Sequence, residues 1–337
     1  MEARYYEKIE GGLVHCHLCP HECRIADGKA GRCRIRVNDG GELRATTYGR
    51  VTSVALDPIE KKPLYHFHPG EMILSLGSAG CNLRCEFCQN WQISQTDVAG
   101  TQLLPEAAVR EAIREGSRGI AYTYNEPMIW FEYVMDTGRR AREEGLYNIL
   151  VTNGYVMPEP LDELLEVVDA MNIDLKSFEG SFYENLCSGT LEPVKETIVR
   201  ASRDCHVEIT TLVIPNRNDA MDVMEEEAKW IASEVGDATP LHLSAYHPSH
   251  KLRERRTPAA TLLKAREVFR RYLKHVYLGN VLTDEGGDTV CGECGATVIG
   301  RLGYRVGTGG MNADGTCAGC GADVGVVTGE HDVGETS

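Results

Sequence analysis

The sequence predicts an α/β protein built on a partial, open (β/α)6 barrel, and two observations support this prediction. From Met72 onward, strand-like apolar stretches alternate with stretches whose apolar residues recur at helical spacing, a pattern typical of a parallel sheet. Proline opens several of the helical stretches, as its fixed φ allows in a first helical turn. The predicted strands span residues 72–77, 119–124, 148–152, 170–175, 207–214 and 241–246, and a further strand spans 275–279.

The rest of the chain divides into segments that flank this core. The 337 residues, 42% of them hydrophobic, suffice for one main domain with smaller appendages. We predict a cysteine-rich extension at 1–70, the α/β core at 71–285, a zinc-ribbon or rubredoxin-like module at 286–328 and a disordered tail at 329–337.

Composition excludes some classes of protein. The net charge of −15 disfavours nonspecific binding to nucleic acid or acidic membranes. No stretch approaches the roughly 18 apolar residues of a membrane span, and the first residues lack the apolar core of a signal peptide. Most of the 13 cysteines fall into closely spaced clusters that suit metal binding in a reducing compartment. We therefore expect a cytoplasmic protein.

The first cysteine cluster lies in the segment HCHLCPHECRIADGKAGRC. Its spacing is C-x2-C-x3-C-x9-C, and its members are Cys16, Cys19, Cys23 and Cys33. Four soft ligands can close a tetrahedral zinc site or anchor an accessory iron–sulfur cluster, and the spacing does not choose between them. Neighbouring His15, His17 and His21 are alternative ligands, although such histidines are more often solvated or support the ligands.

Two segments connect this cluster to the core. Residues 34–56 alternate around Asp39-Gly40-Gly41, which predicts a β-hairpin. Residues 57–70 (DPIEKKPLYHFHPG) are irregular, and two interpretations remain open. In the first, Glu60, Lys61, His66 and His68 line the mouth of a site, and in the second the segment is a surface connection.

A second cysteine cluster follows the predicted strand at 72–77, in a glycine-rich turn. Cys81, Cys85 and Cys88 have the spacing C-x3-C-x2-C, and Phe87 directly precedes the third cysteine. Three thiolates from one loop suit a 4Fe–4S cube, in which each cysteine holds one iron and the fourth iron stays open to a small ligand. A structural zinc or a simple redox cluster is the alternative.

A third cluster lies near the end of the sequence. Two C-x2-C knuckles, each followed by glycine, contain Cys291, Cys294, Cys317 and Cys320. Four thiolates without an open position favour a structural zinc over a redox iron. The two remaining cysteines, Cys187 and Cys205, are expected to be small buried hydrophobes, with a hydrogen-atom or thiol-substrate role as the alternative for Cys187.

The pattern C-x3-C-x-aromatic-C resembles that of the radical S-adenosylmethionine (radical SAM) superfamily. The resemblance implies that the methionyl amine and carboxylate of SAM chelate the open iron and that Phe87 lies near the adenine. One electron from the reduced cluster then cleaves the sulfonium, giving methionine and a 5′-deoxyadenosyl radical that abstracts hydrogen from a substrate. The partial barrel is also the fold that this superfamily implies.

The predicted second and third strands end in residues that the resemblance assigns to SAM. Glu126 belongs to TYNEP, which matches the second half of a Gly-Gly-Glu-Pro type motif and implies a contact to the methionyl amine. The alternative for Glu126 is a carboxylate at a helix N-terminus. Thr152 and Asn153 begin a T-N-G segment similar to that of glycyl-radical-enzyme activases. Activases that bind a monovalent cation place Asp before this segment, where Val151 stands here.

The fourth and later strands add three more candidates. Asp174 and Lys176 lie in a D-L-K segment similar to that of the activases, which implies positions near the ribose and carboxylate of SAM. A lysine can neutralise a carboxylate and an aspartate can accept from ribose hydroxyls, whereas a surface ion pair is the alternative. His247 matches a histidine that approaches the cofactor in activases, with a purely structural role as the alternative.

The order of the motifs allows a narrower resemblance. The segments CHLCPHEC, DPIEKKPLYHF, SAGCNLRCEFCQNWQISQ, TYNEP and NIDLKSF, followed by a terminal zinc ribbon, are similar to AmmeMemoRadiSam-system radical SAM proteins. These proteins are relatives of pyruvate formate-lyase activating enzymes. The resemblance implies AMMECR1-type and MEMO-type partners, and reductive chemistry implies a flavodoxin- or ferredoxin-like electron donor.

We therefore predict an enzyme that cleaves SAM reductively and abstracts hydrogen from an unidentified protein or small molecule. The leading alternative is an activase that makes a glycyl radical on a partner enzyme. A nonenzymatic metal-sensing or electron-transfer scaffold would bind clusters without cleaving SAM. RNA modification guided by the zinc ribbon is disfavoured by the acidity of the chain.

Overall fold

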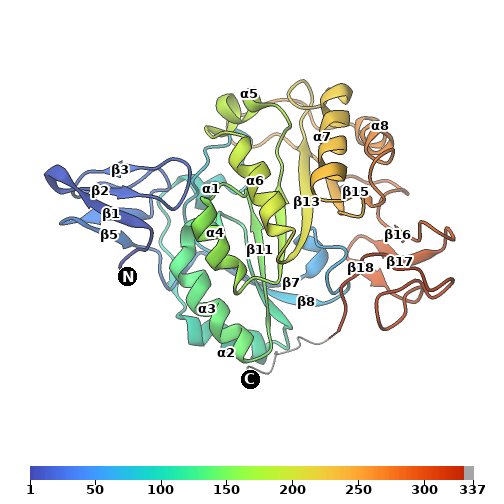
Figure 1. Ribbon diagram of the computed structural model, residues 1–337, viewed down its shortest axis with the longest axis horizontal. Coiled ribbons are helices and arrows are strands. Elements are labelled where there is room, and N and C mark those ends of the chain that lie inside the picture. The colour runs from blue at the N-terminus through green and yellow to red at the C-terminus, as the bar shows by residue number, and fades with distance from the viewer. Residues whose placement is uncertain (330–337) are drawn as a thin grey trace.

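A computed structural model describes residues 1–329 of the chain, organised around one eight-stranded sheet (Figure 1). Seven of its strands run parallel, which confirms the predicted parallel α/β core and includes the further strand predicted near 275–279. In spatial order the strands are β15 (Val276–Gly279), β14 (Leu241–Ala245), β13 (His206–Val213), β12 (Ala170–Asp174), β11 (Tyr147–Thr152), β10 (Gly119–Tyr122), β8 (Met72–Gly77) and β7 (Ser53–Pro58).

Helices connect the parallel strands and cover the sheet (Figure 1). Because each strand is followed by a crossover and then by its parallel neighbour, the carboxyl ends of all seven strands meet at one edge. The main helices are α2 (Pro105–Arg114), α3 (Phe131–Glu143), α4 (Pro158–Leu165), α6 (Glu192–Ala201), α7 (Met221–Glu234) and α8 (Ala259–Phe269). Shorter elements are α1 (Trp91–Gln95), α5 (Gly180–Phe182), a π-helical turn at Tyr183–Cys187 and 3-10 turns at Glu10–Gly12, Ile59–Lys61 and Pro127–Trp130.

The core lies on both faces of this sheet. All four residues of β10 are buried, and so are five of the six residues of β11. Strands of this kind carry nearly continuous apolar runs because helices or loops cover both of their faces. Polar side chains therefore cluster where the strands end, at the edge that the next subsection describes.

The N-terminal segment forms small antiparallel sheets at one end of the molecule (Figure 1). The predicted hairpin is confirmed, with Gly40 and Gly41 at φ of 62° and 86° between its two strands. The strands of this segment are β1 (Tyr6–Ile9), β2 (Leu13–Cys16), β3 (Arg24–Ile25), β4 (Arg36–Asp39), β5 (Glu42–Ala45) and β6 (Arg50–Val51), the last of which pairs with β9 (Thr101–Gln102). Strand β7 pairs antiparallel with β8, so the end of the extension predicted at 1–70 is part of the main sheet.

The C-terminal cysteine module lies at the opposite end (Figure 1). Its strands β16 (Thr289–Val290), β17 (Thr297–Leu302) and β18 (Arg305–Gly307) form an antiparallel sheet with a small core of its own, which includes Cys291, Val298 and Cys317. The tail predicted to be disordered at 329–337 lies, apart from Gly329, outside the described residues. Across residues 1–329, no helix combines the length and the apolar character needed to cross a bilayer.

Candidate active site

The loop after β8 carries Cys81, Cys85 and Cys88 at the carboxyl edge of the sheet. Gly80 has a φ of +89°, and a Cβ atom there would lie 2.6 Å from the carbonyl oxygen of Cys33. Glycine is therefore required on both conformational and steric grounds at the entry to the cysteine turn. The amide of Ser78 donates to Oδ1 of Asn125 at 2.8 Å, which ties this loop to the end of β10.

The three sulfurs of this loop are spaced too widely to be ligands of one tetrahedral ion. They do not all lie within 4.8 Å of one another, whereas tetrahedral zinc with bonds of about 2.3 Å spaces its sulfurs by about 3.8 Å. Sγ of Cys81 accepts from the amide of Leu83 at 3.4 Å and from Nδ2 of Asn153 at 3.6 Å. Burial raises the pKa of the Cys81 and Cys88 thiols, so the thiolate form needs a nearby cation. A cluster in which each thiolate holds its own iron meets both requirements.

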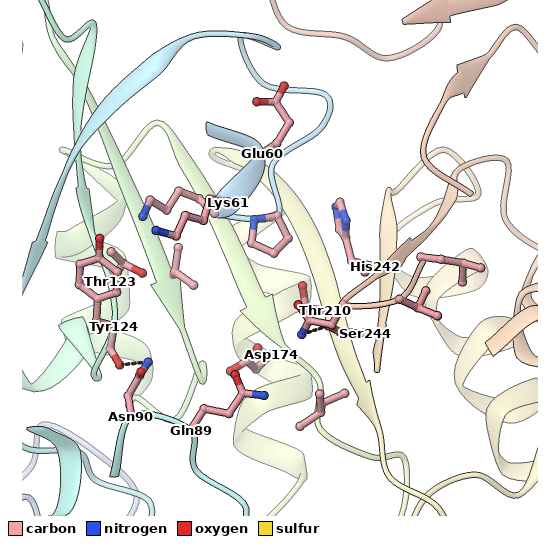
Figure 2. Close-up of a pocket in the computed structure, with 18 of the residues that line it drawn as sticks. Glu60, Lys61, Gln89, Asn90, Thr123, Tyr124, Asp174, Thr210, His242 and Ser244 are labelled. Carbon is pink, nitrogen blue, oxygen red and sulfur yellow. Dashed lines mark hydrogen bonds between the residues drawn. The ribbon is translucent and has the colours of Figure 1, made fainter. Parts of the chain in front are cut away.

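A cavity of about 1020 Å³ opens beside this loop, at the carboxyl ends of the parallel strands (Figure 2). The predicted site residues that line it are Cys81, Cys85, Phe87, Cys88, Glu126, Thr152, Asn153, Asp174 and Lys176. His247, two residues beyond β14, is not among the lining residues of this cavity.

Glu126 is buried where β10 and β11 end. Oε1 accepts from the amide of Met128 at 2.9 Å and from Oγ1 of Thr152 at 2.6 Å, and Oε2 accepts from the amide of Asn153 at 2.8 Å. Burial raises the pKa of Glu126 to about 7 despite these donors. Glu126 therefore caps the 3-10 turn at Pro127–Trp130, as its alternative interpretation expects, and also faces the cavity.

Asp174 and Lys176 form an ion pair inside the cavity, with Nζ 2.7 Å from Oδ2. Burial opposes the charge on Lys176, but Asp174 and the thiols of Cys85 and Cys187 outweigh it and raise the pKa of Lys176. Cys187 itself is buried, and a hydrogen bond with its thiol lowers the pKa of Cys85. The lysine thus places a permanent positive charge beside the cysteine loop.

The segment 57–70 contributes to the cavity lining through Glu60 and Lys61, as its first interpretation predicts, whereas His66 and His68 are not among the lining residues. Nζ of Lys62 lies 2.7 Å from Oδ2 of Asp57 and 4.7 Å from the centre of the Tyr124 ring, and the Tyr124 hydroxyl donates to the same carboxylate. Burial lowers the pKa of Lys62 to about 8. Burial opposes the charge of Asp57 as well, but hydrogen bonds from Lys61, Lys62 and Tyr124 hold its pKa well below the usual range. Sequence reasoning did not single out Asp57, Lys62 or Tyr124.

Two further parts of the lining come from distant segments. His242 and Ser244 alternate along β14 and face the cavity (Figure 2). Nε2 of His242 lies 2.6 Å from Oε2 of the buried Glu208, which fixes the ring. Arg301 of β17 stacks 4.2 Å from the centre of the Tyr65 ring, and the following residues up to Tyr304 also line the cavity. The C-terminal module therefore forms one wall of the site.

The four C-terminal cysteines are arranged to bind one metal ion. Their sulfurs all lie within 4.8 Å of one another, with Cys291 and Cys320 at 3.6 Å and Cys294 and Cys317 at 3.7 Å. These separations are close to the sulfur spacing of tetrahedral zinc, about 3.8 Å for bonds of about 2.3 Å.

The four N-terminal cysteines surround a small, mostly apolar cavity of their own. No three of their sulfurs lie within 4.8 Å of one another, so they are spaced more widely than the C-terminal set. The histidines considered as alternative ligands lie elsewhere. His15 and His17 group with the exposed Glu7, and Nε2 of His21 lies 2.8 Å from the carbonyl oxygen of Asn82.

Comparisons with known proteins agree with this geometry. Residues 76–228 match the family model described as the Radical SAM superfamily. An uncharacterized protein of Methanocaldococcus jannaschii is 46% identical over 306 residues, which cover 89% of this chain and 91% of that protein. The pyruvate formate-lyase 1-activating enzyme of Escherichia coli (strain K12) is 29% identical over 179 residues, 50% of this chain and 71% of that enzyme.

Solved structures include similar folds. A radical SAM methyltransferase from Sphaerobacter thermophilus matches with a TM-score of 0.50 at 16% identity, covering 63% of this chain and 67% of that protein. At this identity the likeness concerns the fold alone. It agrees with the mixed α/β architecture and the parallel sheet described above.

Proposed function

We propose that this chain, whose residues 76–228 match the Radical SAM superfamily model, cleaves SAM reductively and abstracts hydrogen from a substrate. The observation that carries the proposal is the position of the cysteine loop. Cys81, Cys85 and Cys88 open into the same cavity as the buried Glu126 and the Asp174–Lys176 pair. When bound by these cysteines, a reduced 4Fe–4S cluster supplies the electron that breaks the sulfonium of SAM.

The polar residues of the cavity suit the three polar parts of SAM. Lys176 has three N–H donors and uses one on Asp174, which leaves donors for the methionyl carboxylate. Asp174 is about one-third exposed and can accept from ribose hydroxyls. The Glu126 carboxylate offers about four lone-pair positions, of which three protein donors occupy three, so one remains for the methionyl amine.

The walls of the cavity serve to exclude water and to hold the substrate. Lys62 and Tyr124 close one side, and Arg301 and Tyr304 of the C-terminal module close another. A carbon radical must react with its substrate before it reacts with other molecules, so a cavity that excludes solvent suits this chemistry. We propose that Cys291, Cys294, Cys317 and Cys320 hold a structural zinc that keeps this wall folded.

The proposal is tested by anaerobic reconstitution with iron and sulfide, addition of SAM and dithionite, and measurement of 5′-deoxyadenosine. We expect the wild-type protein to produce 5′-deoxyadenosine and Cys85→Ala to lose this activity. Cys205→Ala should keep it, because Cys205 does not line the cavity. A filled cluster that binds SAM and yields no 5′-deoxyadenosine would contradict the proposal and favour the electron-transfer scaffold.

A second candidate function is activation of a glycyl-radical enzyme. The observation that favours it is the 29% identity to a pyruvate formate-lyase activating enzyme across half of the chain. Such an activase would produce a glycyl radical on a partner protein, visible by electron paramagnetic resonance (EPR). AMMECR1-type and MEMO-type proteins, and a flavodoxin- or ferredoxin-like donor, are the partners to test first. The narrower AmmeMemoRadiSam assignment stays a prediction.

A further inference from the structure

The N-terminal cysteine site has features that its spacing in the sequence did not reveal. Its four sulfurs share a cavity with apolar Leu18, Ile25 and Ile129 and with the buried Arg36. The lining cysteines are Cys16, Cys19, Cys23 and Cys33. Such a dry set of thiols suits a metal centre, because buried thiolates need positive charge to be stable.

Arg36 provides an independent sign of an anionic group in this cavity. Nη1 donates to the carbonyl oxygen of Arg4 at 2.7 Å and Nη2 donates to Oε1 of Glu132 at 2.5 Å. Nε is buried without a hydrogen-bond partner. A buried guanidinium with an unused donor is suited to a thiolate-ligated centre, which is negative overall.

The separation of the sulfurs disfavours a single tetrahedral ion. In the C-terminal module the corresponding sulfurs approach to 3.6 and 3.7 Å, as a zinc tetrahedron requires. No three sulfurs of the N-terminal set lie even within 4.8 Å of one another. A cubane needs wider spacing because each cysteine binds a different iron. The amide of Arg32 also donates to Sγ of Cys23 at 3.4 Å, a contact of the kind that tunes cluster potentials.

The N-terminal site lies directly against the catalytic loop. A Cβ atom at Gly80 would be 2.6 Å from the carbonyl oxygen of Cys33, so the main chain of one cysteine loop touches that of the other. His21, between two of the N-terminal cysteines, contacts the carbonyl oxygen of Asn82 at 2.8 Å. Asn82 follows Cys81 in the sequence, and its Oδ1 lies 3.9 Å from Sγ of Cys81. A short path of bonded and contacting atoms therefore joins the two sets of ligands.

We propose that Cys16, Cys19, Cys23 and Cys33 hold a second iron–sulfur cluster that passes electrons to the cluster at the catalytic loop. A low-potential carrier of the ferredoxin or flavodoxin class donates one electron to the N-terminal centre. The carrier is oxidised by one electron, and the N-terminal centre is reduced. The same electron then reduces the catalytic cluster and returns the N-terminal centre to its oxidised state. The metal assignment stands independently, whereas the electron-transfer role rests on the proposed function.

The first test counts metals in the full chain after anaerobic reconstitution. The triple variant Cys81→Ala, Cys85→Ala, Cys88→Ala lacks the catalytic ligands and cannot cleave SAM. We expect it to retain about four irons per chain and an EPR signal on reduction that SAM does not alter. Zinc in place of this iron, or no iron above background, would overturn the assignment.

A second variant tests the same assignment in a chain that keeps the catalytic cysteines, so the result does not depend on whether the triple variant folds. Cys19→Ser should lose about half of the iron of the wild-type chain while the remaining EPR signal still responds to SAM. The matched control Cys205→Ser should keep all of it, because Cys205 lies outside both cavities. If Cys19→Ser keeps the full iron content, the N-terminal assignment is wrong.

The electron-transfer role has its own readout. When both centres are reduced at this proximity, the wild-type EPR spectrum should be broader and relax faster than the sum of the spectra of the two single-cluster variants. After rapid mixing with limiting reduced donor, the catalytic cluster should be reduced more slowly in Cys19→Ser than in Cys205→Ser. Additive spectra together with equal reduction rates would refute the role, even if 5′-deoxyadenosine is produced.

Discussion

Replacing Lys176 by methionine tests the proposed contact between this lysine and the carboxylate of SAM. The lysine side chain is 12% exposed, and its Nζ lies 2.7 Å from Oδ2 of Asp174. Methionine keeps the apolar stem and removes the charge. Asp174 remains 37% exposed and can be solvated when its partner is lost, so we expect the fold to tolerate the change.

The expected loss of affinity follows from the contact that is removed. A hydrogen bond between charged groups contributes about 1.5–3 kcal/mol. At 1.4 kcal/mol for each factor of ten, this corresponds to an increase of about 10- to 150-fold in the Kd for SAM. The upper part of this range is appropriate because the ammonium is largely shielded from water.

The assay is equilibrium dialysis of labelled SAM against anaerobically reconstituted protein, compared at equal iron content. Lys229→Met is the matched control, because Lys229 is 55% exposed on α7 and pairs only with surface Glu225 at 3.2 Å among carboxylates. It should leave the Kd unchanged. A Kd for Lys176→Met within twofold of the wild-type value would refute the carboxylate-binding role of this lysine.

Three further changes have predicted outcomes. Gly80→Ala should destabilise the fold and reduce cluster loading, because its φ of +89° alone costs about 1–3 kcal/mol and its Cβ would collide with the carbonyl oxygen of Cys33. Gly116→Ala is the control, because Gly116 has a φ of +67° and open space around it. The two variants are compared by chemical denaturation and by iron content. Burial raises the pKa of Glu227 to about 8, so the folded state binds more protons than the unfolded state between about pH 4.5 and 8, and stability falls as pH rises through this range. Glu227→Gln should flatten that slope in urea titrations at pH 5.5, 7 and 8, and an unchanged slope would contradict the raised pKa. Cys294→Ser should lower the zinc content by about one ion per chain and expose the C-terminal module to limited proteolysis, with the module of Cys205→Ser as resistant as that of the wild type.

The sequence predicted the parts of the fold whose signals are local. Apolar runs identified the parallel strands, and the turn at Gly40 and Gly41 identified a hairpin, because each depends on residues close in the chain. The cysteine loop after β8 was found for the same reason. Glu126 shows the limit of this approach, since the structure makes it both a helix cap and a lining residue of the cavity.

Other lining residues could not be predicted because only tertiary contacts bring them together. Lys62 precedes the predicted core and lies in a segment without periodicity, yet it lines the cavity beside Tyr124, and both side chains bind the carboxylate of Asp57 behind them. Arg301 belongs to the C-terminal module, which was predicted as a separate unit, yet it lines the cavity of the core. The spacing of cysteines in the sequence also does not tell how far apart their sulfurs lie, and this separation is what distinguishes the N-terminal cysteines from the C-terminal ones.

The wall formed by Arg301 and Tyr304 has a consequence for biosynthesis. Translation produces the cysteine loop and the polar strand ends well before the last knuckle, so a nascent chain has its reactive edge open on the side that the C-terminal module later covers. A small module of this kind folds with the metal it binds. Under the proposed function, zinc supply would then decide when the cavity becomes complete, and chains made without zinc would load iron at an active site that lacks one of its walls.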